Sequence, residues 1–219
     1  MEEKKIEDSR ILLIDKPYRW TSFDVVNKLR YLLKIKKIGH AGTLDPLATG
    51  LLIICTGKMT KRIEEFMGLE KEYTGTLVLG QTTPSHDLET AVSEKKDISQ
   101  VSNESILESA RKLSGKIQQL PPIHSAIKIG GKRAYAFARK GKIPELSPRE
   151  VEVSVFEITS VNLPEVTFRI VCSKGTYIRS LVRDMGDMLG VGAYLSQLCR
   201  TRIGPYKLEQ SIPVEKVTP

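Results

Sequence analysis

The chain has 219 residues, of which 40% are hydrophobic and 27% are charged, a balance typical of a globular protein. No apolar run reaches the roughly 20 residues that a membrane span needs, and the charged start MEEKKIEDSR lacks the apolar segment of a signal peptide, so we expect a cytoplasmic protein. The net charge of +8 favours a polyanionic partner, because each neutralised phosphate releases counterions. Three cysteines without paired spacing argue against a disulfide framework and a CxxC zinc site.

The first half of the chain predicts strands and helices around one glycine-rich segment. Residues 11–14 form an apolar run typical of a buried strand, and residues 21–24 form a capping-box pattern that opens a helix. Residues 39–50, GHAGTLDPLATG, contain three glycines and a proline and are expected to be largely a loop. The pattern then predicts a strand at 51–56, a helix at 59–68, a strand at 72–80 and an exposed loop at 81–104.

The second half mixes both kinds of element without regular alternation. The expected elements are helices at 106–113 and 177–189, strands at 150–161 and 165–172, and a final strand pair near 198–210. The stretch near 124–149 is rich in lysine and arginine and predicts a basic flap. This order indicates an α+β fold with a mixed, mainly antiparallel central sheet flanked by helices and loops, in a single domain over 1–219.

Asp45 is the candidate chemical residue of the glycine-rich segment, and two interpretations stay open for it. A carboxylate on such a loop can act as a nucleophile, a general base or a metal ligand. An aspartate before a proline also caps a turn very often, and spacing alone favours that interpretation. The sequence has no GxxxxGK[ST], GxGxxG after a strand, HExxH or GxSxG motif, which argues against nucleotide hydrolysis, dinucleotide redox chemistry and zinc hydrolysis.

GHAGTLDPLATGLL resembles the signature of the bacterial TruB-type tRNA pseudouridine synthases. Further segments resemble other blocks of that family and occur in the family's order from about residue 11 to 210. These segments are LLIDKPYRWTSFDVV, KEYTGTLVLGQTT, PPIHSAIKIGGKRAYAFARKG, CSKGTYIRSLVRDMG and GAYLSQLCRTRIG. The resemblance implies the pseudouridine synthase catalytic fold and isomerisation of the T-loop uridine of tRNA.

The resemblance also implies roles for three catalytic residues. Asp45 would be the nucleophile that frees uracil N1 from the ribose, after which the base rotates and rejoins through C5. Tyr73 would stack on the target uracil and is a candidate for proton transfer. Arg179 would pair with the carboxylate and keep it ionised in a water-poor pocket, where burial raises the pKa of an acid. The family needs no metal and no organic cofactor.

The family resemblance implies that the target uridine is flipped out of its stacked loop. His40 would fill the space that the base leaves, and the other substrate-binding candidates are Lys71, Asp87, Tyr177 and Leu198. The expected partner is the T-stem-loop of tRNA, bound by a monomer that needs no protein partner, with the basic flap near 124–149 carrying much of the affinity.

Two departures from the family pattern qualify these expectations. The chain ends at Pro219, so we expect no complete C-terminal PUA module and therefore weaker tRNA binding than in longer relatives. Ala41 stands where many members have threonine. Two rival functions remain: a non-catalytic RNA-binding protein on the same fold, and an enzyme on this scaffold that modifies other RNA, including a guide-dependent type.

Overall fold

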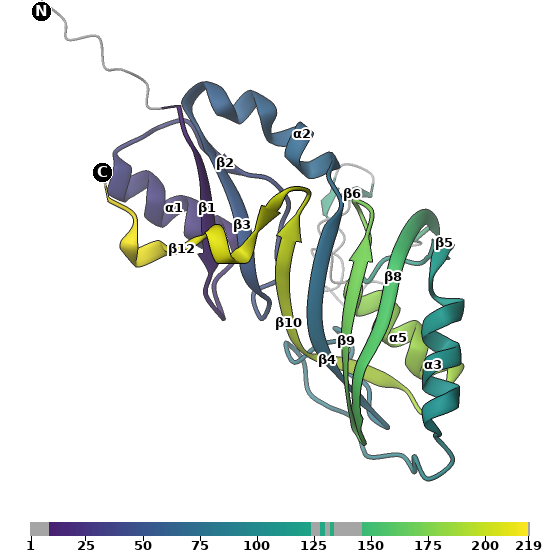
Figure 1. The fold of residues 1–219 in the computed structure, drawn as a ribbon. Coiled ribbons are helices and arrows are strands. Elements are labelled where there is room, and N and C mark those ends of the chain that lie inside the picture. The colour runs from purple at the N-terminus through teal and green to yellow at the C-terminus, as the bar shows by residue number, and fades with distance from the viewer. Residues whose placement is uncertain (1–8, 124–127, 130–131, 134–145, 219) are drawn as a thin grey trace, which may run out of the picture. The chain divides into compact units, whose positions relative to one another are not determined.

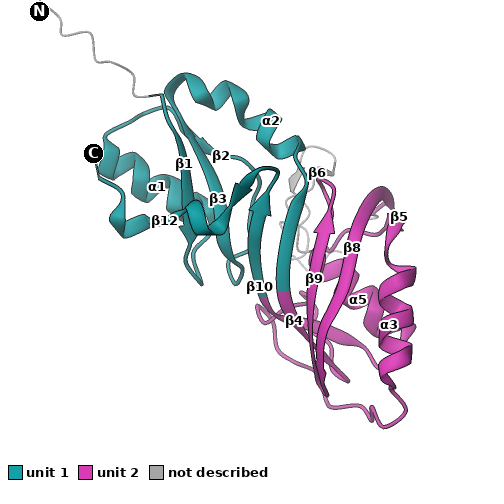
Figure 2. Cartoon of the chain, viewed as in Figure 1, with its two compact units in different colours: residues 1–74, 198–219 teal, residues 75–197 magenta. Residues whose placement is uncertain are grey.

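The computed structural model describes residues 9–123, 128–129, 132–133 and 146–218 (Figure 1). Its contacts divide the chain into two compact units (Figure 2). Unit 1 comprises residues 1–74 and 198–219, and unit 2 comprises residues 75–197. Two strands, β4 (Lys71–Leu79) and β10 (Ala193–Ile203), run from one unit into the other.

Unit 1 is built on the strand order β12-β1-β3-β10. Its further elements are β1 (Ile11–Lys16), α1 (Ser22–Leu33), β2 (Ile38–His40), β3 (Thr49–Thr56), η1 (Gly57–Arg62), α2 (Ile63–Gly68), β11 (Tyr206–Lys207), η2 (Leu208–Gln210), β12 (Ile212–Pro213) and η3 (Val214–Lys216). The β1–β3 pair is antiparallel and the β3–β10 pair is parallel.

Strand β3 is buried almost throughout, because unit 1 covers both of its faces. Leu52 and Ile54 point to one face, where they pack in a cluster with residues of α1. Leu51 and Ile53 point to the opposite face, where they pack with Phe66 of α2. The side-chain alternation of one central strand thus packs α1 against one of its faces and α2 against the other.

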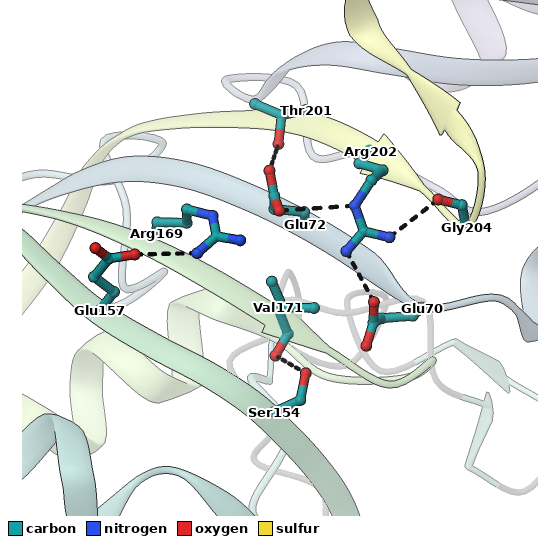
Figure 3. A network of polar contacts seen from close by, with 9 residues as sticks. All are labelled: Glu70, Glu72, Ser154, Glu157, Arg169, Val171, Thr201, Arg202 and Gly204. Atoms are coloured by element: carbon teal, nitrogen blue, oxygen red, sulfur yellow. Dashed lines mark hydrogen bonds and ion pairs between the residues drawn. The ribbon is translucent and has the colours of Figure 1, made fainter.

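Unit 2 has the strand order β4-β9-β8-β5, with antiparallel pairing between β8 and β9 and between β5 and β8. Its further described elements are α3 (Asn103–Lys112), β5 (Gly115–Gln119), β8 (Arg149–Asn162), β9 (Glu165–Cys172) and α5 (Ile178–Met188), beside the short pair β6 (Lys128–Ile129) and β7 (Lys132–Arg133). Helix α3 lies against β8 and α5. Two side-chain hydrogen bonds also link β8 to β9 (Figure 3): Ser154 donates to Val171 O, and Arg169 donates to Glu157.

The α+β class and the mixed, mainly antiparallel sheet are confirmed. The capping box is also confirmed: Thr21 caps α1 and pairs with Asp24. The expected exposed loop at 81–104 is wrong in part, because Thr83, Ser85 and Asp87 are buried.

Three further differences concern element boundaries and coverage. Strand β10 begins five residues before the predicted 198, and β5 was not predicted. The ends of the predicted 39–50 loop belong to β2 and β3. Most of the predicted basic flap near 124–149 lies outside the described residues, and the single domain stays a prediction. No helix of the described residues is long and apolar enough to cross a membrane.

Candidate active site

The loop that carries Asp45 connects β2 to β3 in unit 1. Its start is fixed by the Ala41 N–H, which donates to Ile53 O at 2.9 Å. The Ala48 N–H donates to Asp45 O at 3.1 Å and closes a turn over the Asp-Pro pair. At its end, Gly50 has φ +99°, and a Cβ there would lie 2.4 Å from the backbone oxygen of Arg200. A glycine is therefore required where the loop enters β3.

Both neighbours of Asp45 are held by buried side chains. Ser22, at the start of α1, accepts a hydrogen bond from the Leu44 N–H at 2.8 Å and donates to Leu44 O at 3.2 Å. Lys16, at the end of β1, donates from Nζ to Pro46 O at 3.2 Å. The Asp45 side chain is half-buried between these two anchored peptide units. The structure thus fixes the position of the Asp45 backbone from both sides.

Lys16 also places a positive charge close to Asp45. Its side chain is 0% exposed, and its ammonium donates to Pro17 O at 3.0 Å and to Trp20 O at 2.5 Å. Burial lowers the pKa of Lys16 from 10.5 to about 8, while the negative charge of Asp45 acts in the opposite direction. At neutral pH the ammonium is therefore mostly charged, and it favours the ionised form of Asp45.

A second buried cation, Arg200 of β10, donates to backbone oxygens near both ends of the loop. Its Nε donates to Leu51 O at 2.8 Å and its Nη2 to Gly42 O at 3.2 Å. Burial, and then the charge of Arg200, lower the pKa of His40 below its usual 6.5, against the effect of a backbone hydrogen bond at Gly42. His40 is therefore neutral at neutral pH. Within the described part of the chain, its buried Nδ1 has no hydrogen-bond partner.

Tyr73 lies on β4, which polar contacts join to the end of β10 (Figure 3). Arg202 contacts Glu70 at 2.8 Å and Glu72 at 3.7 Å, and Thr201 donates to Glu72 at 2.9 Å. Because side chains alternate along a strand, Tyr73 points to the face opposite Glu72. Tyr73 is buried there.

Lys71 and Leu198 are the other two predicted residues of unit 1. Lys71 shares the strand face of Tyr73 and is buried, and its ammonium donates to Met67 O and Leu69 O, each at 2.6 Å. These bonds satisfy carbonyls at the end of α2, so Lys71 has a structural role, and a contact with substrate stays a prediction. Leu198 is buried on β10, where its carbonyl accepts from Thr49 Oγ1 at 3.4 Å.

Unit 2 brings two predicted residues into direct contact. Arg179, in the first turn of α5, lies with Nε 3.6 Å from Asp87 Oδ2 and donates from Nη1 to Ser85 O at 3.0 Å. Both charged side chains are buried. Removal of either partner would leave the other charge buried without compensation.

Tyr177 precedes α5, and its backbone is fixed by a buried glutamine. Its N–H donates to Gln119 Oε1 at 2.8 Å, and its carbonyl accepts from Gln119 Nε2 at 3.1 Å. These bonds hold the start of the helix that carries Arg179. The predicted pairing of Arg179 with Asp45 stays a prediction, because the two residues belong to different units.

The sequence matches known profiles over most of its length. The profile described as "TruB family pseudouridylate synthase (N terminal domain)" matches residues 30–178, and the profile described as "tRNA pseudouridylate synthase B C-terminal domain" matches residues 179–219. The chain belongs to the TruB family. A protein named tRNA pseudouridine synthase B from Phocaeicola vulgatus is 51% identical over 95% of this chain and 92% of its own length. A protein of the same name from Flavobacterium johnsoniae is 51% identical over 94% of this chain and 93% of its own length.

Solved structures agree with the TruB assignment. A chain of a Cbf5–Nop10–Gar1 complex is 31% identical, with a TM-score of 0.73 over 96% of this chain and 53% of its own length. A chain of an H/ACA RNP bound to a substrate RNA containing 2'-deoxyuridine is 28% identical, with a TM-score of 0.69. The present chain spans about half the length of these two chains. The predicted pseudouridine synthase fold is thereby confirmed.

Three residues that bear on the TruB site were not singled out from the sequence: Lys16, Ser22 and Arg200. Each is buried and holds the backbone of the Asp45 loop or the strand that follows it. Lys16 and Ser22 lie in the family block LLIDKPYRWTSFDVV, which was the available signal. Among the described residues, no group of three histidine, cysteine, aspartate or glutamate side chains is arranged to hold a metal ion.

Proposed function

We propose that this chain isomerises the T-loop uridine of tRNA, at position 55, to pseudouridine, with Asp45 as the nucleophile. Two relatives that share half of its residues over nearly their whole length carry the name tRNA pseudouridine synthase B, which supports the reaction and the substrate. The observation that carries the proposal is the anchoring of Leu44 and Pro46 on either side of Asp45, next to the buried ammonium of Lys16.

The proposed reaction is an isomerisation, so its atoms balance without a co-reactant. Asp45 assists the departure of uracil by attacking the target nucleoside, and the bond between C1' and N1 breaks. The base rotates within the site, a bond forms between C1' and C5, and the bond between Asp45 and the nucleoside breaks, which regenerates the carboxylate. The proton on C5 is lost and N1 gains a proton. Lys16 contributes by favouring the ionised carboxylate that begins the sequence.

The other predicted residues act on the substrate in this proposal. Tyr73 stacks on the flipped uracil and is the candidate for proton transfer. His40, neutral at neutral pH, fills the space that the uracil leaves in the RNA. Arg179 supplies a further positive charge for the Asp45 carboxylate, next to Asp87. Lys71, Tyr177 and Leu198 complete the proposed contacts with the substrate.

We further propose that the enzyme works as a monomer in the cytoplasm and needs no protein partner. The test uses purified protein and an unmodified tRNA transcript, with pseudouridine mapped at nucleotide resolution. We expect product at the T-loop uridine, none in a transcript with cytidine at that position, and none with Asp45→Asn, which should still bind the RNA. Product at another position would overturn the substrate assignment, and full activity of Asp45→Asn would overturn the nucleophile.

A further inference from the structure

The outward face of α1 exposes aromatic side chains that the core does not use. Phe23 and Tyr31 are 59% and 85% exposed, and with Asn27 they form a stripe at a spacing of four residues. Tyr18, in the turn before α1, is 48% exposed. The opposite side of the helix packs into the core of unit 1. Exposed aromatic side chains gathered on one face indicate an interaction surface.

The segment that carries this stripe is basic. The stretch from Pro17 to Lys37 contains six lysine or arginine residues and one acidic residue, Asp24. Asp24 is engaged in the capping box, where Thr21 donates to it from N and Oγ1. The guanidinium of Arg19 lies over the Tyr18 ring, 5.6 Å from its centroid. Cations interleaved with exposed aromatic rings suit RNA, whose phosphates pair with the cations and whose bases stack on the rings.

Arg19 has a backbone conformation that an arginine rarely adopts. Its φ of +66° lies in the left-handed region, which glycine occupies without penalty. The Lys16 ammonium donates to Pro17 O and Trp20 O, on either side of Arg19, and the same ammonium donates to Pro46 O. One buried lysine therefore links the turn that carries the exposed Arg19 to the Asp45 loop.

We infer that Tyr18, Arg19, Phe23, Lys28 and Tyr31 form an RNA-binding surface, the α1 surface, that holds nucleotides flanking the target uridine next to Asp45. The bases stack on the three aromatic rings, and Arg19 and Lys28 contact phosphates. This inference rests on the proposed function, because it concerns the RNA on which Asp45 acts. It commits to looped or single-stranded RNA, whose bases are unstacked and open to aromatic side chains.

Arg19→Gly separates a binding role from a structural one. The glycine fits φ +66° better than arginine, so the melting temperature should not fall below that of the wild type. The affinity for tRNA should weaken, and the slope of log Kd against log salt concentration should fall by about one. Phe23→Ala and Tyr31→Ala should each weaken binding about five-fold or more through lost stacking. Filter binding over a salt series measures all three variants.

Matched controls come from the far end of α1 and from unit 2. Lys34 caps the C-terminal end of α1 with φ +53°, so Lys34→Gly removes the same charge in the same conformation at the end of the helix opposite Ser22, which contacts the Asp45 loop. Leu107→Ala and Lys112→Ala change an exposed apolar and an exposed basic residue on α3. These three should bind tRNA with smaller losses than Arg19→Gly.

Each outcome decides the inference. Unchanged affinity and salt slope in Arg19→Gly, or an equal loss in Lys34→Gly, would overturn the α1 surface. Phe23→Ala and Tyr31→Ala could instead leave the tRNA affinity unchanged and lower the oligomer mass measured by sedimentation. In that case the surface joins copies of the chain and the inference is wrong. The same samples report on the proposed function separately: a wild type that binds tRNA but makes no pseudouridine would overturn that function and leave the binding result standing.

Discussion

The two units differ in the bonds that the structure describes around their predicted carboxylates. Around Asp45 in unit 1, the described hydrogen bonds from Ser22 and Lys16 go to the backbone of neighbouring residues. Asp87 in unit 2 is held by its side chain, which accepts from the Glu89 N–H at 3.0 Å and pairs with Arg179.

This difference separates two uses of a carboxylate. Asp45 is half-buried, and its loop is fixed in place by bonds to other residues, as a nucleophile requires. Asp87 is a buried anion, and its backbone carbonyl also accepts from the hydroxyls of Thr83 and Ser85 at 2.6 and 3.1 Å. We therefore interpret Asp87 as a positioning residue for Arg179.

The largest effect is expected when the pair in unit 2 is broken. Arg179→Met leaves Asp87 buried without its cation, which should lower the free energy of unfolding by about 3–5 kcal/mol. Arg179→Lys keeps the charge and should lose less. Urea unfolding followed by circular dichroism measures both variants. A loss below about 1 kcal/mol in Arg179→Met would show that Asp87 does not depend on this pair.

A smaller effect on stability and a clear effect on turnover are expected at the Asp45 loop. Ser22→Ala leaves the Leu44 N–H without its bond, which should lower the free energy of unfolding by about 1–3 kcal/mol. If Ser22 positions Asp45, kcat should fall about 10- to 100-fold while KM for tRNA stays unchanged, since misplacement of a catalytic group by 1 Å has effects of that order.

Ser109→Ala is the matched control for Ser22→Ala. Ser109 is also a buried serine, but its hydroxyl donates to Ser105 O within α3. Its kcat should equal that of the wild type. Equal kcat values in Ser22→Ala and Ser109→Ala would contradict a positioning role for Ser22.

A further prediction concerns the pH dependence of stability at Lys16. Burial lowers its pKa to about 8 in the folded chain, whereas the unfolded chain has the usual value of 10.5. Between pH 8 and 10.5 the unfolded chain therefore binds more protons than the folded chain. Wild-type stability should therefore rise relative to Lys16→Met as the pH increases from 8 to 10.5, and the difference should be constant below pH 8. Urea unfolding at pH 7, 8.5 and 10 measures it. If the stability difference between the wild type and Lys16→Met is constant from pH 7 to pH 10, the pKa of Lys16 is not lowered in the folded chain.

The Asp45 loop could be found from sequence because its glycines and the surrounding blocks are local features. The residues that hold it were missed because each has a more ordinary interpretation. Ser22 lies inside the capping-box pattern of α1, and Lys16 stands at a strand end, where lysine is normally exposed. Only the folded chain shows that Lys16 bonds to the backbone of Pro46, 30 residues away, and that Ser22 bonds to the backbone of Leu44, 22 residues away.

The buried part of residues 81–104 could not be predicted for a related reason. Its polar composition is typical of an exposed loop, but Thr83 and Ser85 bond to the backbone of Asp87 and make burial tolerable. The hydrophobic pattern of a sequence does not show which buried polar groups form hydrogen bonds with each other. The long-range pairing of β10 with β3, residue Cys199 against Thr49, is equally invisible to local patterns.

The most direct test of the contrast between the two carboxylates compares Asp45→Asn with Asp87→Asn in one experiment. Initial rates of pseudouridine formation and free energies of unfolding are measured side by side at pH 7. We predict that Asp45→Asn forms no product and unfolds within about 1 kcal/mol of the wild type, as expected for a half-buried loop residue. We predict that Asp87→Asn is less stable but still forms product. Product formation by Asp45→Asn at the wild-type rate would contradict the assignment of Asp45 as the nucleophile.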